Sequence, residues 1–204
     1  MSKNKIEILA LIDRSGSMYN IIEEAVGAFN AFIGEQRELG VDDVVKVTLA
    51  AFDDKYEVIY DRVALDKVKE LTVSDVRPRG MTALYDSIGK LIMGAKYPTR
   101  DTILLIQTDG HENMSKEFNQ TAIKAMIKER EAMGWDVNFI GAGIDAVEEG
   151  SKFGISANKA YSVTSDAAGM DMFKTNISCA TASYRSNKFE ESLKADGQVT
   201  DEGS

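Results

Sequence analysis

Residues 6–17 read IEILALIDRSGS, an apolar run that stops at an acidic residue and a turn with two serines. The apolar run has too few polar positions for a strand with one face in water, so it predicts a central strand that is buried on both faces. Asp13, Ser15 and Ser17 follow at its carboxyl end. Carboxylate and hydroxyl oxygens are the ligands that Mg²⁺ prefers. The stretch therefore predicts a parallel sheet with a metal site at its edge.

The composition fits one globular α/β domain. The chain has 204 residues, of which 44% are hydrophobic and 28% are charged. That is enough for one full core but not for two large domains. The formal net charge is −9 and the isoelectric point is near 4.8, whereas binding to nucleic acid depends on Lys and Arg to release counterions from phosphates. We therefore expect no nucleic-acid partner.

The cellular location is predicted from hydropathy and cysteine content. No apolar segment approaches the roughly 20 residues that cross a bilayer, so we expect no membrane partner. Lys3 and Lys5 precede an apolar stretch, as in a signal peptide, but that stretch is short and contains Glu7. The single cysteine, Cys179, cannot form an internal disulfide and falls in a helical pattern, which favours a buried thiol in a reducing compartment. These features predict a cytoplasmic protein.

The apolar patterns alternate between strand and helix periods along the chain. Val44 to Phe52 and Tyr56 to Tyr60 predict an antiparallel hairpin at one sheet edge, and Thr102 to Gln107 predicts a second buried strand. The other predicted strands are Val137 to Ile140 and a short one near Tyr161, and the predicted helices are Met18 to about Leu39, Leu84 to Ala95, Glu117 to Met133, a short one after Asp145, and a last one from about Met170 to Tyr184. This alternation predicts a mostly parallel sheet.

Two further loops carry candidate metal ligands. Asp109 follows the second buried strand just as Asp13 follows the first, and Thr82 precedes a predicted helix. In parallel α/β sheets, ligands gather beyond the carboxyl ends of the strands. Right-handed crossovers place these three loops on rims that meet there. Asp13, Ser15, Ser17, Thr82 and Asp109 are therefore candidates to share one ion.

Together these residues resemble the metal-ion-dependent adhesion site (MIDAS) of von Willebrand factor type A (vWA) domains, here as a stand-alone intracellular type. Asp13-x-Ser15-x-Ser17, the isolated Thr82 and Asp109 fill all five motif positions in order. The resemblance spans about residues 5–185. It implies a three-layer, Rossmann-like α/β fold, in which helices cover both faces of a mostly parallel six-stranded sheet with one antiparallel edge strand. We place the domain at residues 1–187 and an acidic, disordered tail at residues 188–204.

The resemblance also implies a role for each residue. Ser15, Ser17 and Thr82 contact the ion through hydroxyl oxygens. Asp13 and Asp109 act directly or through water, and a carboxylate from a partner protein completes the octahedron. Two carboxylates leave a divalent ion with little excess negative charge, so an incoming Asp or Glu is still attracted. The donors suit Mg²⁺ or Mn²⁺.

Each residue also has a purely structural alternative. Ser17 is a candidate N-cap of the helix that follows it, and Asp13 is a candidate to cap the same turn. Thr82 is a candidate to cap the helix that begins near Leu84. Met81 stands where vWA domains often have a second glycine, and it is a candidate for an apolar contact at the rim of the site.

The neighbouring polar residues leave further alternatives open. His111, Glu112 and Asn113 are either acid–base groups, a ligand-reading rim or a solvated loop. Asp86 either orients a metal-bound water or is an exposed acid in the first turn of a helix. Arg77 and Arg79 either steer an acidic partner or serve solubility.

Three functions compete on this sequence. The first is a non-enzymatic adaptor whose ion binds an acidic residue of a partner protein. The second is a metal-dependent hydrolase or phosphoryl-transfer enzyme with His111 or Glu112 as base. Such enzymes normally carry an acid two residues after a nucleophilic aspartate, and Ser15 stands there instead. The third is a scaffold in which a structural metal ties the loops together. We favour the adaptor.

Overall fold

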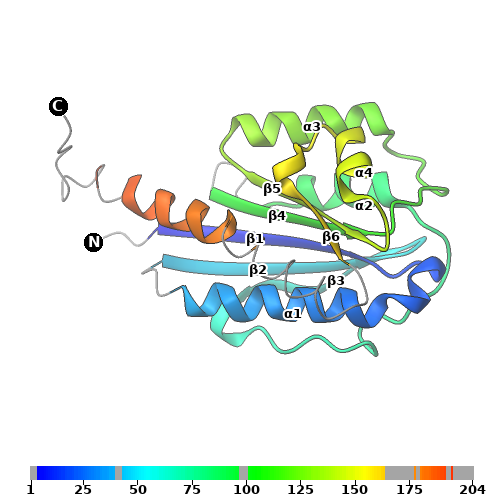
Figure 1. Cartoon of the computed structure of the whole chain (residues 1–204), viewed down its shortest axis with the longest axis horizontal. Coiled ribbons are helices and arrows are strands. Elements are labelled where there is room, and N and C mark those ends of the chain that lie inside the picture. Colours follow the sequence, from blue (N-terminus) through cyan, green and yellow to red (C-terminus); the bar gives the residue numbers. More distant parts are fainter. Residues whose placement is uncertain are drawn as a thin grey trace.

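A six-stranded sheet in the order β3-β2-β1-β4-β5-β6 forms the centre of the molecule (Figure 1). This computed structural model describes residues 4–39, 43–96, 101–163, 177, 180–191 and 194. The strands are β1 (Asn4–Asp13), β2 (Asp43–Phe52), β3 (Tyr56–Ala64), β4 (Asp101–Thr108), β5 (Asp136–Ala142) and β6 (Ala160–Val163). All neighbouring pairs are parallel except β2 and β3. The expected fold class, a mostly parallel sheet with one antiparallel edge strand, is confirmed.

Helices cover both faces of the sheet. They are α1 (Ile22–Glu38), α2 (Leu84–Met93), α3 (Gln120–Ala132) and α4 (Ala146–Lys152), with short 3₁₀ helices η1 (Gly16–Asn20), η2 (Leu65–Lys67) and η3 (Ala157–Lys159). A further helix occupies residues 180–191. The core on one face contains α1 and the C-terminal helix, and the core on the other contains α2, α3 and α4.

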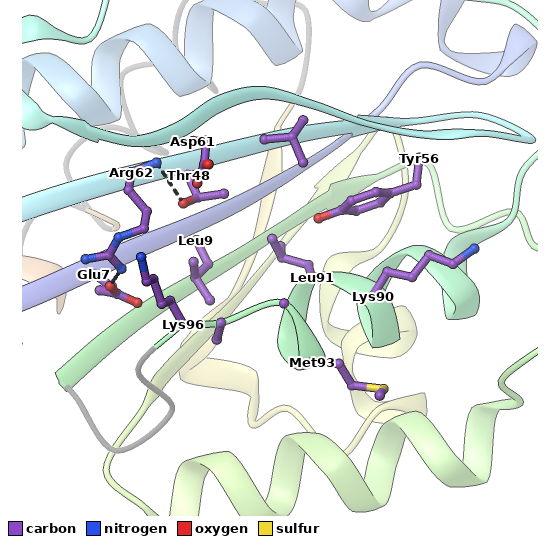
Figure 2. Close-up of a pocket in the computed structure, with 13 residues that line it drawn as sticks. Glu7, Leu9, Thr48, Tyr56, Asp61, Arg62, Lys90, Leu91, Met93 and Lys96 are labelled. Atoms are coloured by element: carbon purple, nitrogen blue, oxygen red, sulfur yellow. Dashed lines mark hydrogen bonds and ion pairs between the residues drawn. The ribbon is translucent and has the colours of Figure 1, made fainter.

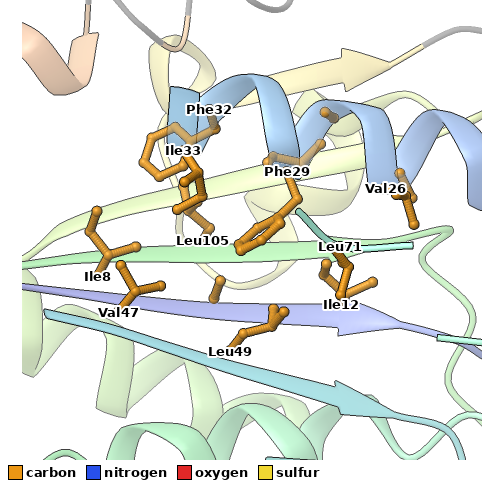
Figure 3. Packing of buried hydrophobic residues seen from close by; sticks show 14 of the residues in the cluster. Ile8, Ile12, Val26, Phe29, Phe32, Ile33, Val47, Leu49, Leu71 and Leu105 are labelled. Carbon is orange, nitrogen blue, oxygen red and sulfur yellow. The ribbon is translucent and has the colours of Figure 1, made fainter. Parts of the chain in front are cut away.

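Strand β1 supplies both cores, as its apolar sequence from Ile8 to Ile12 predicts. Ile8 and Ile12 point to α1, where they meet Phe29 and Phe32, whereas Leu9 belongs to the opposite core (Figure 3). A strand that is buried on both faces carries apolar residues on both sides rather than at alternate positions. This is why the run before Asp13 decides the fold.

Two helices begin later than the sequence pattern predicts. The helix expected from Met18 is instead the 3₁₀ helix η1 followed by α1 at Ile22. The helix expected from Glu117 begins at Gln120, because Asn119 accepts a hydrogen bond from the backbone amide of Ala122 and caps the helix there. The apolar periodicity continues through the residues before each helix and therefore does not mark where the helix begins.

The C-terminal helix is anchored to the sheet by polar contacts. The guanidinium of Arg185 donates to Asp43 at 2.7 and 2.9 Å, and the hydroxyl of Tyr184 donates to the carbonyl of Gly134 at 2.7 Å. Residues 188–191 continue this helix. The expected start of the last helix at Met170, Cys179, and residues 192, 193 and 195–204 of the expected tail lie outside the described residues.

Within the described part of the chain, no helix combines the length and the apolar composition that a membrane crossing requires.

Candidate metal centre

Asp13 ends β1 in a fully buried position. Its carboxylate accepts a hydrogen bond of 2.6 Å from the hydroxyl of Thr108 and one of 2.7 Å from the backbone amide of Ser15. Burial nevertheless dominates and raises the pKa of Asp13 from 3.8 to about 6, and the nearby negative charge of Asp109 adds to the rise. The adjacent Arg14 does not neutralise Asp13, because its guanidinium pairs with Asp53 and Glu57 instead.

Ser15 and Ser17 place their hydroxyls together directly after Asp13. Their Oγ atoms are 3.0 Å apart, with Ser15 buried and Ser17 exposed. Neither hydroxyl caps a helix: Ser15 precedes η1 without a side-chain cap bond, and the residue at the N-cap of α1 is Ile21. The capping alternative for Ser17 is therefore wrong.

Thr82 lies on a second loop that meets the first through its backbone. The amide of Gly16 donates to the carbonyl of Gly80 at 3.3 Å, and the amide of Arg79 donates to the carbonyl of Arg14 at 2.8 Å. Thr82 is buried, and the N-cap of α2 is Ala83, which makes no side-chain cap bond. The capping alternative for Thr82 is also wrong, while its neighbour Met81 is 48% exposed at the rim.

Asp109 lies on a third loop, which contacts the second. Asp109 is buried, and its carboxylate accepts a hydrogen bond of 3.3 Å from the amide of His111. Asn113 then pairs with Thr82: its side-chain oxygen accepts from the Thr82 amide at 2.9 Å, and its own amide donates to the Thr82 carbonyl at 3.1 Å. The three predicted loops thus meet at the carboxyl edge of the sheet.

Glu112 joins the third loop to the start of α2. Its carboxylate accepts hydrogen bonds from the amide of Tyr85 at 3.1 Å and from the amide of Met114 at 2.9 Å. It also accepts from the amide and the hydroxyl of Ser115, each at 2.7 Å. A carboxylate with four donors is held in place and poorly suited to act as a general base. His111 is exposed on the same loop.

Asp86 is a second anchor for this loop, which is neither of the roles expected from the sequence. It is 6% exposed rather than a surface acid. Its two carboxylate oxygens accept hydrogen bonds from the backbone amides of residues 116, 117 and 118, each at 2.9 Å. Burial alone would raise its pKa, but these amides outweigh burial and lower it.

Asp53 lies in the turn between the two strands of the predicted hairpin, where the sequence gives no sign of a role at the site. Its buried carboxylate accepts from Arg14 at 3.1 Å and from Arg79 at 2.7 Å, and so links the first two loops. Burial would raise the pKa of Asp53, but the hydrogen bond from Arg79 and the two positive charges lower it. Arg79 is therefore a partner of Asp53, whereas Arg77 is exposed. No local pattern distinguishes such an acid from a turn residue.

The donor set suits a hard divalent cation. The described residues hold no group of three or more His, Cys, Asp or Glu that could bind a metal, and the candidate centre relies on two carboxylates supplemented by hydroxyls. A carboxylate that is buried beside a second acid, with the neighbouring arginine directed elsewhere, favours a bound cation. Asp13, Ser15, Ser17, Thr82 and Asp109 are the residues that would hold it, and the ion would supply Lewis acidity.

No protein-family model and no curated protein sequence matches the chain. Solved structures match its fold. Proximal thread matrix protein 1 (PTMP1) from the mussel byssus gives a TM-score of 0.63 at 15% identity, over 88% of this chain and 47% of that protein. A structure of PTMP1 with a zinc-occupied MIDAS motif gives 0.61 at 15% identity, over 87% of this chain and 46% of that protein. The vWF domain of the type V pili tip protein Mfa5 from Porphyromonas gingivalis gives 0.61 at 12% identity, over 88% of this chain and 97% of that domain.

At these identities the likeness shows the fold alone. The chain has a vWA-like α/β fold, and it spans about half the length of PTMP1.

Proposed function

We propose that the chain is a non-enzymatic adaptor domain that binds a partner protein through a divalent ion. Asp13, Ser15, Ser17, Thr82 and Asp109 hold Mg²⁺ or Mn²⁺, and an Asp or Glu of the partner completes its coordination. The observation that carries this proposal is the meeting of three loops whose oxygen donors include only two carboxylates. A site with so few charges leaves the ion attractive to a further carboxylate.

Two further observations support an interaction module rather than an enzyme. Glu112, a candidate base, is held by four hydrogen bonds. The structural neighbours include a byssus matrix protein with a zinc-occupied MIDAS motif and a pilus tip protein. A cytoplasmic location remains part of the proposal, and cell fractionation tests it.

The first test is calorimetric titration of the whole chain with Mg²⁺ and Mn²⁺. We expect one site in the wild type and none in Asp13→Ala or Thr82→Ala. Asp66→Ala, which removes an exposed acid on η2, is the matched control and should bind as the wild type does. If neither ion binds the wild-type chain, the proposal fails.

The second test is partner capture by wild type and Asp13→Ala, each with Mg²⁺ and with chelator. A partner retained only by wild type with Mg²⁺ supports the adaptor. If chelator lowers the melting temperature while the partner stays bound, the ion has only a structural role. Turnover of phosphoester substrates that is lost in His111→Ala would favour the enzyme instead.

A further inference from the structure

Asp53 holds two arginines beside the candidate metal centre. Its carboxylate is fully buried. One oxygen, Oδ2, accepts a hydrogen bond from the Nε of Arg14 at 3.1 Å and another from the Nε of Arg79 at 2.7 Å. Arg14 stands between two candidate metal ligands in the sequence, Asp13 and Ser15. The position of its charge therefore matters to any cation that binds there.

Arg14 is a buried cation with few partners. Its side chain is 4% exposed, and within the described residues it pairs with Asp53 and with Glu57, which lies 2.8 Å from its Nη1. Its buried Nη2 has no hydrogen-bond partner there. Glu57 also lies 3.8 Å from Arg79, so these two acids and two arginines balance in charge. Because Glu57 is 57% exposed and solvent screens its charge, Asp53 is the main partner that holds the Arg14 guanidinium.

The backbone joins the same loops without the Asp53 carboxylate. The amide of Arg79 donates to the carbonyl of Arg14 at 2.8 Å, and the amide of Ala83 donates to the carbonyl of Asp53 at 3.0 Å. The Oδ1 atom of Asp53 accepts from the amide of Lys55 at 2.7 Å, and the side-chain oxygen of an asparagine can accept the same bond. A change of Asp53 to asparagine therefore keeps these contacts and removes only the negative charge that the two arginines face.

Asp13 has no cation of its own among the described residues. Its hydrogen-bond donors are neutral, the hydroxyl of Thr108 and the backbone amide of Ser15. Without the charge of Asp53, the positive charge of Arg14 would lie uncompensated in the same buried region, where charges are screened less than at the surface. A positive charge in that place repels a divalent cation.

We propose that Asp53 is a positioning residue that sets the metal affinity of the site. Its charge holds the guanidinium of Arg14 away from Asp13 and offsets it, which leaves the carboxylates of Asp13 and Asp109 free to attract the ion. This inference rests on the proposed metal binding, and it adds a residue outside the five candidate ligands.

Calorimetric titration of the whole chain with Mg²⁺ tests the proposal through variants that change the charge in opposite directions. Asp53→Asn should weaken binding about tenfold or more, because it leaves Arg14 uncompensated. Arg14→Gln should bind at least as tightly as the wild type, because it removes a positive charge and keeps every ligand. The double variant, which removes both charges, should return to within about threefold of the wild type.

A bracing role predicts a different pattern. If Asp53 only tied the loops together, Asp53→Asn and Arg14→Gln would both weaken Mg²⁺ binding and the double variant would recover nothing, and that result would overturn the proposal. Urea denaturation in chelator measures the free energy of unfolding without the metal. Both single variants disturb the same buried ion pair and should lose stability, so a loss of stability cannot explain affinities that change in opposite directions.

A second buried pair of an acid and an arginine supplies the matched control. Glu7 is 2% exposed and pairs with Arg62 in a pocket of about 670 Å³ on the sheet face that carries α2 (Figure 2). None of the five candidate metal ligands lines this pocket, and Glu7 precedes Asp13 on β1 by a stretch of strand about 20 Å long. Glu7→Gln should therefore lose stability but keep its Mg²⁺ affinity. Equal losses of affinity in Glu7→Gln and Asp53→Asn would contradict a specific role for Asp53.

The outcomes separate this inference from the proposed function. A wild type that binds neither Mg²⁺ nor Mn²⁺ overturns both. If the wild type binds Mg²⁺ but Asp53→Asn binds it equally well, or if the variants follow the bracing pattern, the proposed function stands and only the role of Asp53 is wrong.

Discussion

Replacing Asp13 by asparagine should stabilise the chain when no divalent ion is present. Folding buries the Asp13 carboxylate completely and raises its pKa from 3.8 to about 6. A raised pKa means that the folded state binds the proton more tightly than the unfolded state does. The contribution of Asp13 to stability is therefore fully present below pH 3.8 and is lost as the pH rises through about 6. Asparagine, which does not ionise, avoids this loss.

The size of the effect follows from the pKa and the hydrogen bonds. The rise from 3.8 to about 6 corresponds to about 3 kcal/mol at neutral pH. Part of this gain in stability is offset at the hydrogen bond from Thr108. Its hydroxyl donates to the charged Asp13 carboxylate at 2.6 Å in the wild type, but to the neutral side-chain amide oxygen of asparagine in the variant. A hydrogen bond to a charged acceptor contributes about 1.5–3 kcal/mol and one to a neutral acceptor about 0.5–1.5 kcal/mol, so the exchange costs about 1–1.5 kcal/mol. We expect Asp13→Asn to be more stable by about 1–2 kcal/mol in chelator at pH 7.

Urea denaturation of both proteins in chelator, from about pH 4 to pH 7.5, measures this difference. Asp53 and Asp86 have lowered pKa values and give the opposite pH dependence, but they are present in both proteins and cancel. The stability advantage of the variant should grow with pH. Saturating Mg²⁺ should shrink or reverse it, because only the wild type binds the ion. A difference that is flat with pH, or a wild type that is the more stable protein in chelator at pH 7, would refute the reasoning.

Other substitutions test the loops and the core. Asp86→Ala removes the acceptor of the three amides at residues 116–118. It should lower the free energy of unfolding by about 3 kcal/mol and weaken Mg²⁺ binding, and an unchanged Mg²⁺ affinity by calorimetry would contradict the anchoring role. Gly80→Ala should destabilise the protein, because φ is 69° and a Cβ would meet the Asp54 carboxylate. In the control Gly34→Ala, the added Cβ has no atom within 4 Å, so the free energy of unfolding should rise by about 0.5–1 kcal/mol. Similar urea midpoints for the two variants would refute this. Phe32→Ala should lower the free energy of unfolding, measured with urea, by about 3–5 kcal/mol and leave the Mg²⁺ affinity unchanged. A loss below about 1 kcal/mol would show that the core repacks.

The order and type of the main elements follow from local patterns. The apolar run before Asp13 predicted a strand buried on both faces, and β1 supplies both cores. The hairpin of β2 and β3 was predicted from its short turn, and it forms one sheet edge. These features depend on the period of apolar residues and on short-range turn chemistry, which one stretch of sequence contains in full.

The supporting contacts of the candidate site were not predictable in the same way. The sequence offers Glu112 as a base and Asp86 as an exposed acid. In the structure Glu112 binds the amides of Tyr85 and Ser115, and Asp86 binds the amide of residue 116. Asp53 looked like a turn residue, yet it binds Arg14 and Arg79. Each role depends on which buried donors come within reach of a carboxylate, and loop packing settles that.

The α/β alternation, the buried character of β1 and the kinds of oxygen donor follow from the amino-acid sequence, because periodicity and residue chemistry are local properties. The meeting of the loops of Ser15, Thr82 and Asp109 follows from the packing of the folded chain. The same holds for the absence of a helix-capping bond from Ser17 or Thr82 and for the ion pair between Arg62 and Glu7. These outcomes join residues that are distant in sequence, and strand register and helix length fix their distances in space.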